Sequence, residues 1–176
     1  DAGDQAGYAM SLSADGRTVA IGSPLNNPDG ISSAWYERAG QVRIYRLNNS
    51  DQWVQVGADI IGDLGDRTGA SLSLSGDGNV LAIANPRLDD KGYVSIYEYE
   101  QGSWQQIGQD LTANNHILGA VSLSFYGETI AFGSIPLDEA GTNAGRVQVL
   151  KRGEADEWNK IGSDIVGISP DDFSGG

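Results

Sequence analysis

Few side chains in this sequence are of the types that do chemistry in enzymes. Cysteine is absent, which excludes thiol nucleophiles, disulfides and thiolate metal sites. His116 is the only histidine, and no second histidine or cysteine accompanies it to complete a metal site. Its neighbours supply no serine and carboxylate set of the kind that a hydrolase uses. We expect His116 to be a surface or loop residue, and we predict neither a metal nor a cofactor.

Carboxylates are abundant, and two adjacent pairs have the form of a glycoside-cleaving dyad, Asp89-Asp90 and Asp138-Glu139. In a chain with 24 acidic residues, such neighbours arise by chance in solvated loops. A third motif, Ser13-Ala14-Asp15-Gly16, is similar to the start of a sialidase Asp box. Arg17-Thr18 follows, however, where that box continues with a spaced glycine and an aromatic residue. We therefore predict no catalytic residues and no enzymatic activity.

The net charge of the chain excludes some classes of binding partner. The formal net charge is −13 at pH 7, and phosphate backbones repel such a surface, so we predict no nucleic-acid binding. No apolar run approaches the ~20 residues of a membrane-spanning helix, so we predict no membrane insertion. The first residues lack the basic and apolar regions of a signal peptide, which fits a mature or excised segment as well as a cytosolic protein. Acidity and the absence of cysteine favour an extracellular or cell-surface protein.

An internal repeat of about 50–60 residues is the strongest feature of the sequence. Three units align, at residues 1–65, 66–114 and 115–171, and residues 172–176 begin a further one. Each unit holds four short segments of β-branched and aromatic residues, closed by Gly, Pro, Asn or Asp, which is typical of strands. No stretch shows helical periodicity. Four consecutive antiparallel strands, repeated, indicate the blades of a β-propeller.

The four segments differ as the strands of a blade do. First segments alternate serine with leucine, as in Ser11-Leu12-Ser13, which suits innermost strands beside a wet channel. Second segments such as Leu81-Ala82-Ile83 are apolar throughout, as expected where a neighbouring blade covers each face. Fourth segments carry glutamine and lysine and so form outer edges. We predict an all-β fold of three four-stranded antiparallel blades, part of a larger or assembled propeller.

Three blades leave two apolar faces open, because a propeller closes with about four to eight. If each face exposes on the order of 500 Å², about 12 kcal/mol per face is forgone at ~25 cal/mol/Å². Two explanations are open: the chain belongs to a longer propeller, or copies associate, for instance as two chains. The matching start and tail, Asp4–Gly7 and Asp172–Gly175, favour the longer propeller. The predicted partners are thus further blades or other copies.

Glycines at the start of first segments pair with Gly-Ser-Pro-like motifs after second segments. This pairing resembles the FG-GAP repeat of the integrin α-subunit propeller and of many bacterial and algal surface proteins. Integrin-like repeats often bind calcium through several aspartates, but here that loop holds one carboxylate, Asp15 or Asp77, so calcium binding is not implied. The matching positions are Ala6-Gly7, Thr68-Gly69 and Leu118-Gly119, followed by Gly22-Ser23-Pro24, Ala84-Asn85-Pro86 and Gly133-Ser134-Ile135-Pro136.

Aromatic residues offer the candidate contact sites. Tryptophan recurs at one position of every unit, Trp53, Trp104 and Trp158, which marks an indole packed between blades, with sugar stacking as the alternative. The pair Trp35-Tyr36 occurs in one unit only, in the longest insertion, and we predict a partner-binding site there. Its flanking charged residues are Asp29, Glu37 and Arg38. Asn48 opens an Asn-Asn-Ser sequon and is a candidate for glycosylation.

We therefore predict a non-catalytic extracellular scaffold or adhesion module, possessing no enzyme site and binding protein or glycan partners through blade loops. Such a module would belong to a polymeric coat, appendage or matrix. Two alternatives stay open, because a fold does not carry an activity with it. One is a carbohydrate-binding, lectin-like propeller. The other is the non-catalytic part of a hydrolase whose active site lies in further blades.

Overall fold

The computed structural model describes residues 3–27, 38–87, 92–112, 116–136 and 144–168. Within these ranges every regular element is a β-strand, and the strands form three antiparallel sheets. The predicted all-β fold of three four-stranded units is confirmed. No helix in the described part of the chain is long and apolar enough to cross a membrane.

Each sheet follows the chain in simple order, from an inner strand outward. The first sheet comprises β1 (Ala9–Leu12), β2 (Thr18–Ser23), β3 (Gln41–Leu47), β4 (Trp53–Gln55) and β5 (Ile60–Ile61). The second comprises β6 (Ser71–Leu74), β7 (Val80–Asn85), β8 (Tyr93–Glu100), β9 (Ser103–Gln106) and β10 (Leu111–Thr112). The third comprises β11 (His116–Leu123), β12 (Thr129–Pro136), β13 (Arg146–Arg152), β14 (Trp158–Lys160) and β15 (Ile165–Val166).

The outer strand of each sheet is broken into two pieces, which the sequence pattern did not predict. In the first sheet, β4 pairs with one half of β3 and β5 with the other. A left-handed glycine separates the pieces in every sheet, with φ of 76° at Gly57, 67° at Gly108 and 71° at Gly162. Only glycine adopts this conformation without strain, so the break recurs at the same repeat position.

In the first two sheets the turns between first and second strands are closed by serine and aspartate side chains. The Ser13 hydroxyl donates to Asp15 Oδ1 at 2.6 Å and accepts from the Thr18 amide at 2.9 Å. The Ser75 hydroxyl makes the equivalent bonds to Asp77 and Val80. The Ser13 hydroxyl and the Arg17 amide lower the pKa of Asp15 below its ordinary value. Asp15 therefore acts as part of a hairpin turn.

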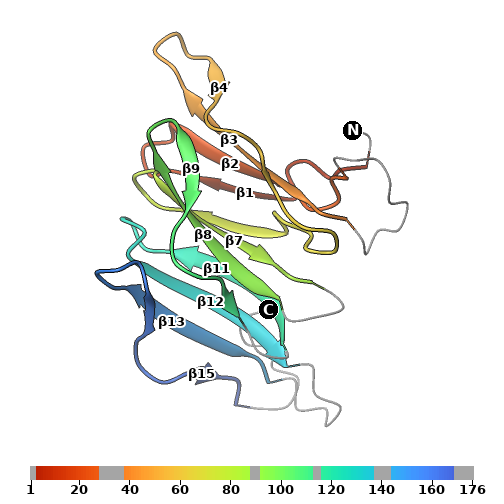
Figure 1. Ribbon diagram of the computed structural model, residues 1–176, viewed down its shortest axis with the longest axis vertical. Helices are drawn as coiled ribbons and strands as arrows, with labels where there is room; N and C mark the ends of the chain where they lie inside the picture. Colours follow the sequence, from red (N-terminus) through yellow and green to blue (C-terminus); the bar gives the residue numbers. More distant parts are fainter. Residues whose placement is uncertain (1–2, 28–37, 88–91, 113–115, 137–143, 169–176) are drawn as a thin grey trace.

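The three sheets lie face to face, one above the other in Figure 1, with their first strands adjacent. Serines connect these strands between sheets. Ser11 Oγ accepts from the Leu74 amide and Ser73 Oγ from the Leu123 amide, both at 2.9 Å. The serines predicted to line a wet channel thus satisfy backbone amides of the next sheet, which small hydroxyl side chains achieve at close approach.

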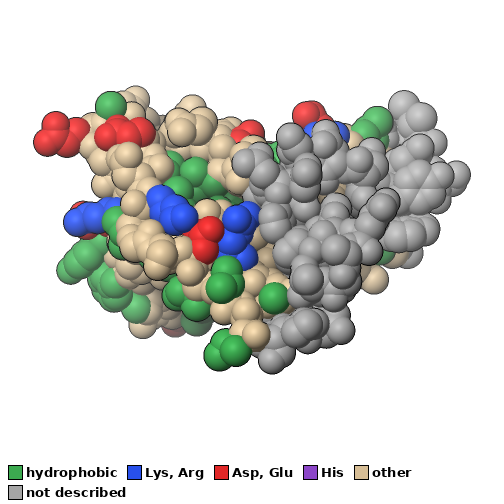
Figure 2. Space-filling model, turned by 90° about the horizontal axis from the view of Figure 1, so that it is seen from below, with side chains coloured by type: hydrophobic (Ala, Val, Ile, Leu, Met, Phe, Trp, Pro, Cys, Tyr) green, Lys and Arg blue, Asp and Glu red, His purple; other side chains and the backbone are tan. Residues whose placement is uncertain are grey.

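Two apolar layers fill the spaces between the sheets. The layer between the first and second sheets contains Ala20, Val42, Ile44, Ile60, Leu72, Leu74, Leu81, Ile83 and Trp104. The layer between the second and third contains Val80, Ala82, Ala84, Val94, Ile96, Ile107, Leu111, Val121, Ile130, Phe132 and Trp158. All six residues of β7 are buried, because this strand has a neighbouring sheet on both sides. Seen from the side of the third sheet, the surface shows hydrophobic side chains among charged ones (Figure 2).

Tryptophan interlocks with the left-handed glycine of the preceding sheet. The Trp104 indole lies over Gly57, where an added Cβ would come within 2.7 Å of the ring. Its Nε1 also donates to the Val56 carbonyl at 3.1 Å. Trp158 covers Gly108 in the same way, with a 3.1 Å approach. The tryptophans of the second and third sheets are therefore packing elements between sheets, whereas Trp53 of the first sheet is 47 % exposed.

Trp104→Ala should destabilise the protein by about 3–5 kcal/mol, because it empties a buried indole site and removes a hydrogen bond. The measurement is the free energy of unfolding in urea. Gln105→Ala, at the exposed neighbouring position, is the control and should change that free energy by less than about 0.5 kcal/mol. Equal effects of the two changes would contradict the interlock.

Candidate functional site

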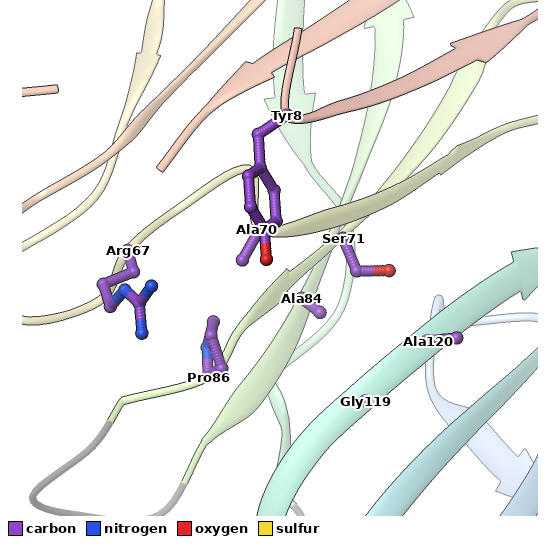
Figure 3. A pocket seen from close by; sticks show the side chains of 8 residues that line it. All are labelled: Tyr8, Arg67, Ala70, Ser71, Ala84, Pro86, Gly119 and Ala120. Carbon is purple, nitrogen blue, oxygen red and sulfur yellow. The ribbon is translucent and has the colours of Figure 1, made fainter. Parts of the chain in front are cut away.

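A pocket of about 330 Å³ lies beside the beginnings of β1 and β6 and the irregular middle of β11. Tyr8 reaches it from the start of the first sheet, while Arg67 and Ser71 come from the second. Figure 3 shows the Tyr8 ring between the Arg67 guanidinium on one side and the Ser71 hydroxyl on the other. Small side chains leave the space open. The remaining lining residues are Ala70, Ala84, Pro86, Gly119 and Ala120.

Arg67 is held at the pocket by an unusual backbone conformation. Its φ is 55°, in the left-handed region that side chains other than glycine seldom adopt. The Arg67 amide donates to the Arg38 carbonyl at 3.1 Å, and the Thr68 amide donates to the Ala39 carbonyl at 2.9 Å. Thr68 also forms an isolated parallel bridge with Gly40. The connection between the first and second sheets is thus fixed on both sides of Arg67.

A buried ionic network anchors the same connection. The Asp66 side chain has no solvent exposure and accepts a 2.6 Å hydrogen bond from the Tyr93 hydroxyl. It also accepts from the Asp63 amide at 2.8 Å and lies 3.4 Å from Arg87 Nε. Burial and the Asp66 carboxylate raise the pKa of Tyr93 far above its ordinary value. A buried carboxylate persists only with such partners, so these contacts fix the turn that carries Arg67.

A second, neutral network lies on the other side of Arg67. The Thr68 hydroxyl donates to Asn85 Oδ1 at 2.7 Å, and Asn85 Nδ2 donates to Ser95 Oγ at 3.1 Å. Asn85 is 1 % exposed and Ser95 is 4 % exposed. Buried Asp66 and buried Thr68 therefore flank Arg67 in the sequence, and the alternation leaves the arginine side chain to line the pocket.

The chemistry of this pocket is that of binding. A guanidinium and two hydroxyl groups can hold a carboxylate, a phosphate or a sugar, and the Tyr8 ring, 60 % exposed, supplies an apolar face. The described lining includes no carboxylate and no histidine to act as a general base. In the described ranges no group of three or more His, Asp or Glu side chains is placed to hold a metal ion. Proton transfer at this pocket would therefore require acid or base side chains from outside the described lining.

Of the residues that the sequence predicts to bind a partner, the structure describes only Arg38, whose backbone lies beside the pocket residue Arg67. Trp35, Tyr36, Asp29 and Glu37 lie outside the described residues, as do both adjacent acidic pairs. Arg38 is half-buried, and its carbonyl accepts from Arg67. Partner binding there stays a prediction.

Two further residues singled out from the sequence, His116 and Asn48, lie in a strand and in a hairpin turn. His116, expected at the surface or in a loop, is the first residue of β11, opposite Pro136 of β12, so it lies in a strand, and its surface position stays a prediction. Asn48 Oδ1 accepts from the Ser50 amide at 2.8 Å and from the Gln52 amide at 3.0 Å, which closes the hairpin between β3 and β4. Its glycosylation stays a prediction.

Sequence reasoning missed the residues that build the pocket, although one signal for them was present. Asp66-Arg67-Thr68-Gly69 has the same Asp-x-x-Gly form as Asp4–Gly7. Gln5, at the position of Arg67, is also left-handed, with a φ of 56°. The repeat thus sets one strained residue before the first strand of two sheets. Strain at a binding surface is a functional signal.

Comparison with known proteins places this architecture among propellers. No family model matches the chain, and no curated protein matches it. Solved structures match over nearly its whole length. The fold is a β-propeller. The three described sheets are its blades, while the FG-GAP family is not supported.

Three solved structures illustrate the likeness. A periplasmic gluconolactonase of Pseudomonas aeruginosa has 15 % identity and a TM-score of 0.54, covering 93 % of this chain and 58 % of that one. A putative 6-phosphogluconolactonase of Bacteroides uniformis has 21 % identity and a TM-score of 0.54, covering 92 % and 40 %. Sqt1 of Chaetomium thermophilum has 13 % identity and a TM-score of 0.58, covering 97 % and 38 %. The chain spans between about two fifths and three fifths of these proteins.

The prediction of no enzymatic activity is wrong in the light of these comparisons. Two of the three similar structures are named as lactonases, so the blades of this chain have the architecture of known enzymes. The reasoning failed for a physical reason. A propeller site draws side chains from several blades, so three blades without a catalytic set do not exclude catalysis.

Tyr93→Phe should destabilise the protein by about 1–3 kcal/mol at neutral pH, because it removes a hydrogen bond to the buried Asp66 carboxylate. The raised folded-state pKa of Tyr93 means that its contribution is fully present below about pH 10 and is lost as the pH rises further. The wild-type unfolding free energy should therefore fall more steeply above pH 10 than that of the variant.

Urea unfolding at pH 8 and pH 11 measures this difference. Tyr126→Phe is the matched control, because Tyr126 is 67 % exposed and lies in the turn between β11 and β12. Parallel pH dependence in the wild type and Tyr93→Phe would mean that Tyr93 and Asp66 are not coupled as the structure has them.

Proposed function

We propose that these three blades are part of a propeller hydrolase that opens a small sugar-derived lactone or ester. The pocket at the start of the first strands forms one wall of the substrate site, and further blades supply the groups that transfer protons. The observation that carries this proposal is the likeness to the two lactonase structures over 92–93 % of the chain. It replaces the scaffold and adhesion role as the main hypothesis.

The position of the pocket supports the proposal. In open and closed β-architectures, ligands bind where several strands end together, because loops and strand ends from separate units can surround them. This pocket joins residues of all three blades at one end of their inner strands. Its left-handed Arg67 is anchored by two buried networks, as a residue that positions a ligand must be.

Arg67 favours a substrate that carries negative charge. The chain has a net charge of −13, which repels anions over most of the surface. The positive charge of Arg67 in the pocket lining therefore favours a phosphate or carboxylate group there over the rest of the surface. A phosphorylated lactone is the substrate that fits this arrangement best.

The same proposal includes a location outside the cytoplasm. The Pseudomonas structure is named as a periplasmic protein, and this chain, which has no cysteine, needs no particular redox environment. Attachment to a cell surface, binding of a protein or glycan partner and membership of the FG-GAP family stay predictions from the sequence.

The test is lactone hydrolysis by the intact gene product that contains these residues. Acid release at constant pH should exceed the spontaneous rate with gluconolactone or 6-phosphogluconolactone. Arg67→Asn removes the charge and tolerates the left-handed backbone, so it should lower kcat/KM for 6-phosphogluconolactone by about 10- to 100-fold. The same variant should lower kcat/KM for the uncharged gluconolactone by a smaller factor.

Arg17→Asn is the matched control for this experiment. Arg17 lies in the turn after β1, at the opposite end of the blade, where its guanidinium donates to the Leu47 and Asn48 carbonyls. Its kcat/KM should stay within about twofold of wild type. Absence of turnover with both lactones would refute the hydrolase, and equal losses in the two arginine variants would refute the role of this pocket.

A further inference from the structure

The outward face of the first blade carries unburied copies of residues that are buried in the other blades. Met10 is 65 % exposed, whereas Leu72, at its repeat position, is 8 % exposed. Leu12 is 56 % exposed, whereas Leu74 is 5 % exposed. Trp53 is 47 % exposed, whereas Trp104 and Trp158 are 9 % and 6 % exposed. We name the surface formed by Met10, Leu12 and Trp53 the leading face.

The outward face of the third blade carries the complementary residues. Ile165 is 61 % exposed, whereas Leu111 at its position in the second blade is 6 % exposed. Ile161 is 45 % exposed, and its equivalent Ile107 is 9 % exposed. An added Cβ at Gly162 meets no atom within 4 Å. We name the surface formed by Ser122, Ile161, Gly162 and Ile165 the trailing face.

The two internal interfaces show how such faces pair. A tryptophan of one blade covers the left-handed glycine of the blade before it, as Trp104 covers Gly57. A serine of the inner strand accepts an amide of the next blade, as Ser73 does from Leu123. Among the described residues, no glycine lies under the tryptophan of the leading face, and no tryptophan or backbone amide of another blade meets the glycine and the exposed Ser122 of the trailing face. Both faces thus continue an interface that the structure already contains twice.

We propose that further blades of the same polypeptide cover both faces. The blade before Trp53 presents a left-handed glycine on its outer strand, and the blade after Gly162 presents a tryptophan. A single larger polypeptide is favoured because the similar structures are single chains of which this one covers only 38–58 %. This proposal depends on the packing and on the length of the similar structures, and it does not require hydrolase activity.

Two glycine variants of the intact gene product test the trailing face. Gly162 and Gly102 have φ of 71° and 89°, and an added Cβ at either meets no atom within 4 Å. Alanine therefore causes similar backbone strain at both. Gly102 lies in the exposed turn between β8 and β9, away from the two described interfaces between blades. If an indole covers Gly162, Gly162→Ala should lower Tm by about 5 °C or more beyond the effect of Gly102→Ala.

A second pair of variants, in which an aromatic residue is replaced, tests the leading face in the same way. This pair also keeps the proposal testable if Gly162→Ala does not fold. Trp53→Phe should lower Tm clearly more than Tyr126→Phe, which changes an exposed aromatic residue in a turn. Light scattering should give a monomer larger than 18.6 kDa whose Tm is independent of protein concentration.

Three results would overturn the proposal. Equal shifts in Tm within each matched pair would mean that the two faces are open to solvent. A mass near 18.6 kDa for the gene product would mean that the polypeptide contains no further blades to cover the two faces. A dimer whose Tm rises with concentration would assign the faces to a second copy instead.

Discussion

The structure depends on one packing constraint: the flat apolar side of each sheet is buried only against another sheet of the same kind. The interlock of Trp104 with Gly57 and of Trp158 with Gly108 sets the spacing and the order of the sheets. Fully burying a large apolar side chain contributes about 1.5–3 kcal/mol. Net stabilities are only about 5–15 kcal/mol, so a few such side chains on each face decide whether a blade holds its neighbours.

This constraint also creates the site. Because the sheets pack face to face, their first strands begin side by side, and the connections between blades pass over that end. One connection carries Arg67 between the buried side chains of Asp66 and Thr68, each bonded to a different part of the second blade. The pocket is therefore a product of blade packing, and its shape changes if the spacing between blades changes. The proposed ligand binding would therefore be coupled to stability through the same contacts.

Much of the fold could be predicted from the sequence because each strand has a recognisable pattern within a few consecutive residues. The alternating strand β6 and the strand β7, which is apolar except for its last residue, show their place in the sheet by their sequence pattern alone. The break of the outer strand was missed, since a glycine within a strand-like segment looks the same whether or not its φ is positive. The site was missed because its contacts are not local: Tyr93 meets Asp66 from 27 positions along the chain. The sequence showed the Asp-x-x-Gly repeat, but not which side chains would face the pocket.

Hydroxyl-radical footprinting of the intact gene product, read by mass spectrometry at each tryptophan, tests the packing constraint most directly. Trp104 and Trp158 lie in internal interfaces and calibrate the oxidation rate of a covered indole. If every blade face is covered by a like neighbour, Trp53 should be oxidised as slowly as those two. Rapid oxidation of Trp53, with Trp104 and Trp158 still protected, would contradict the account.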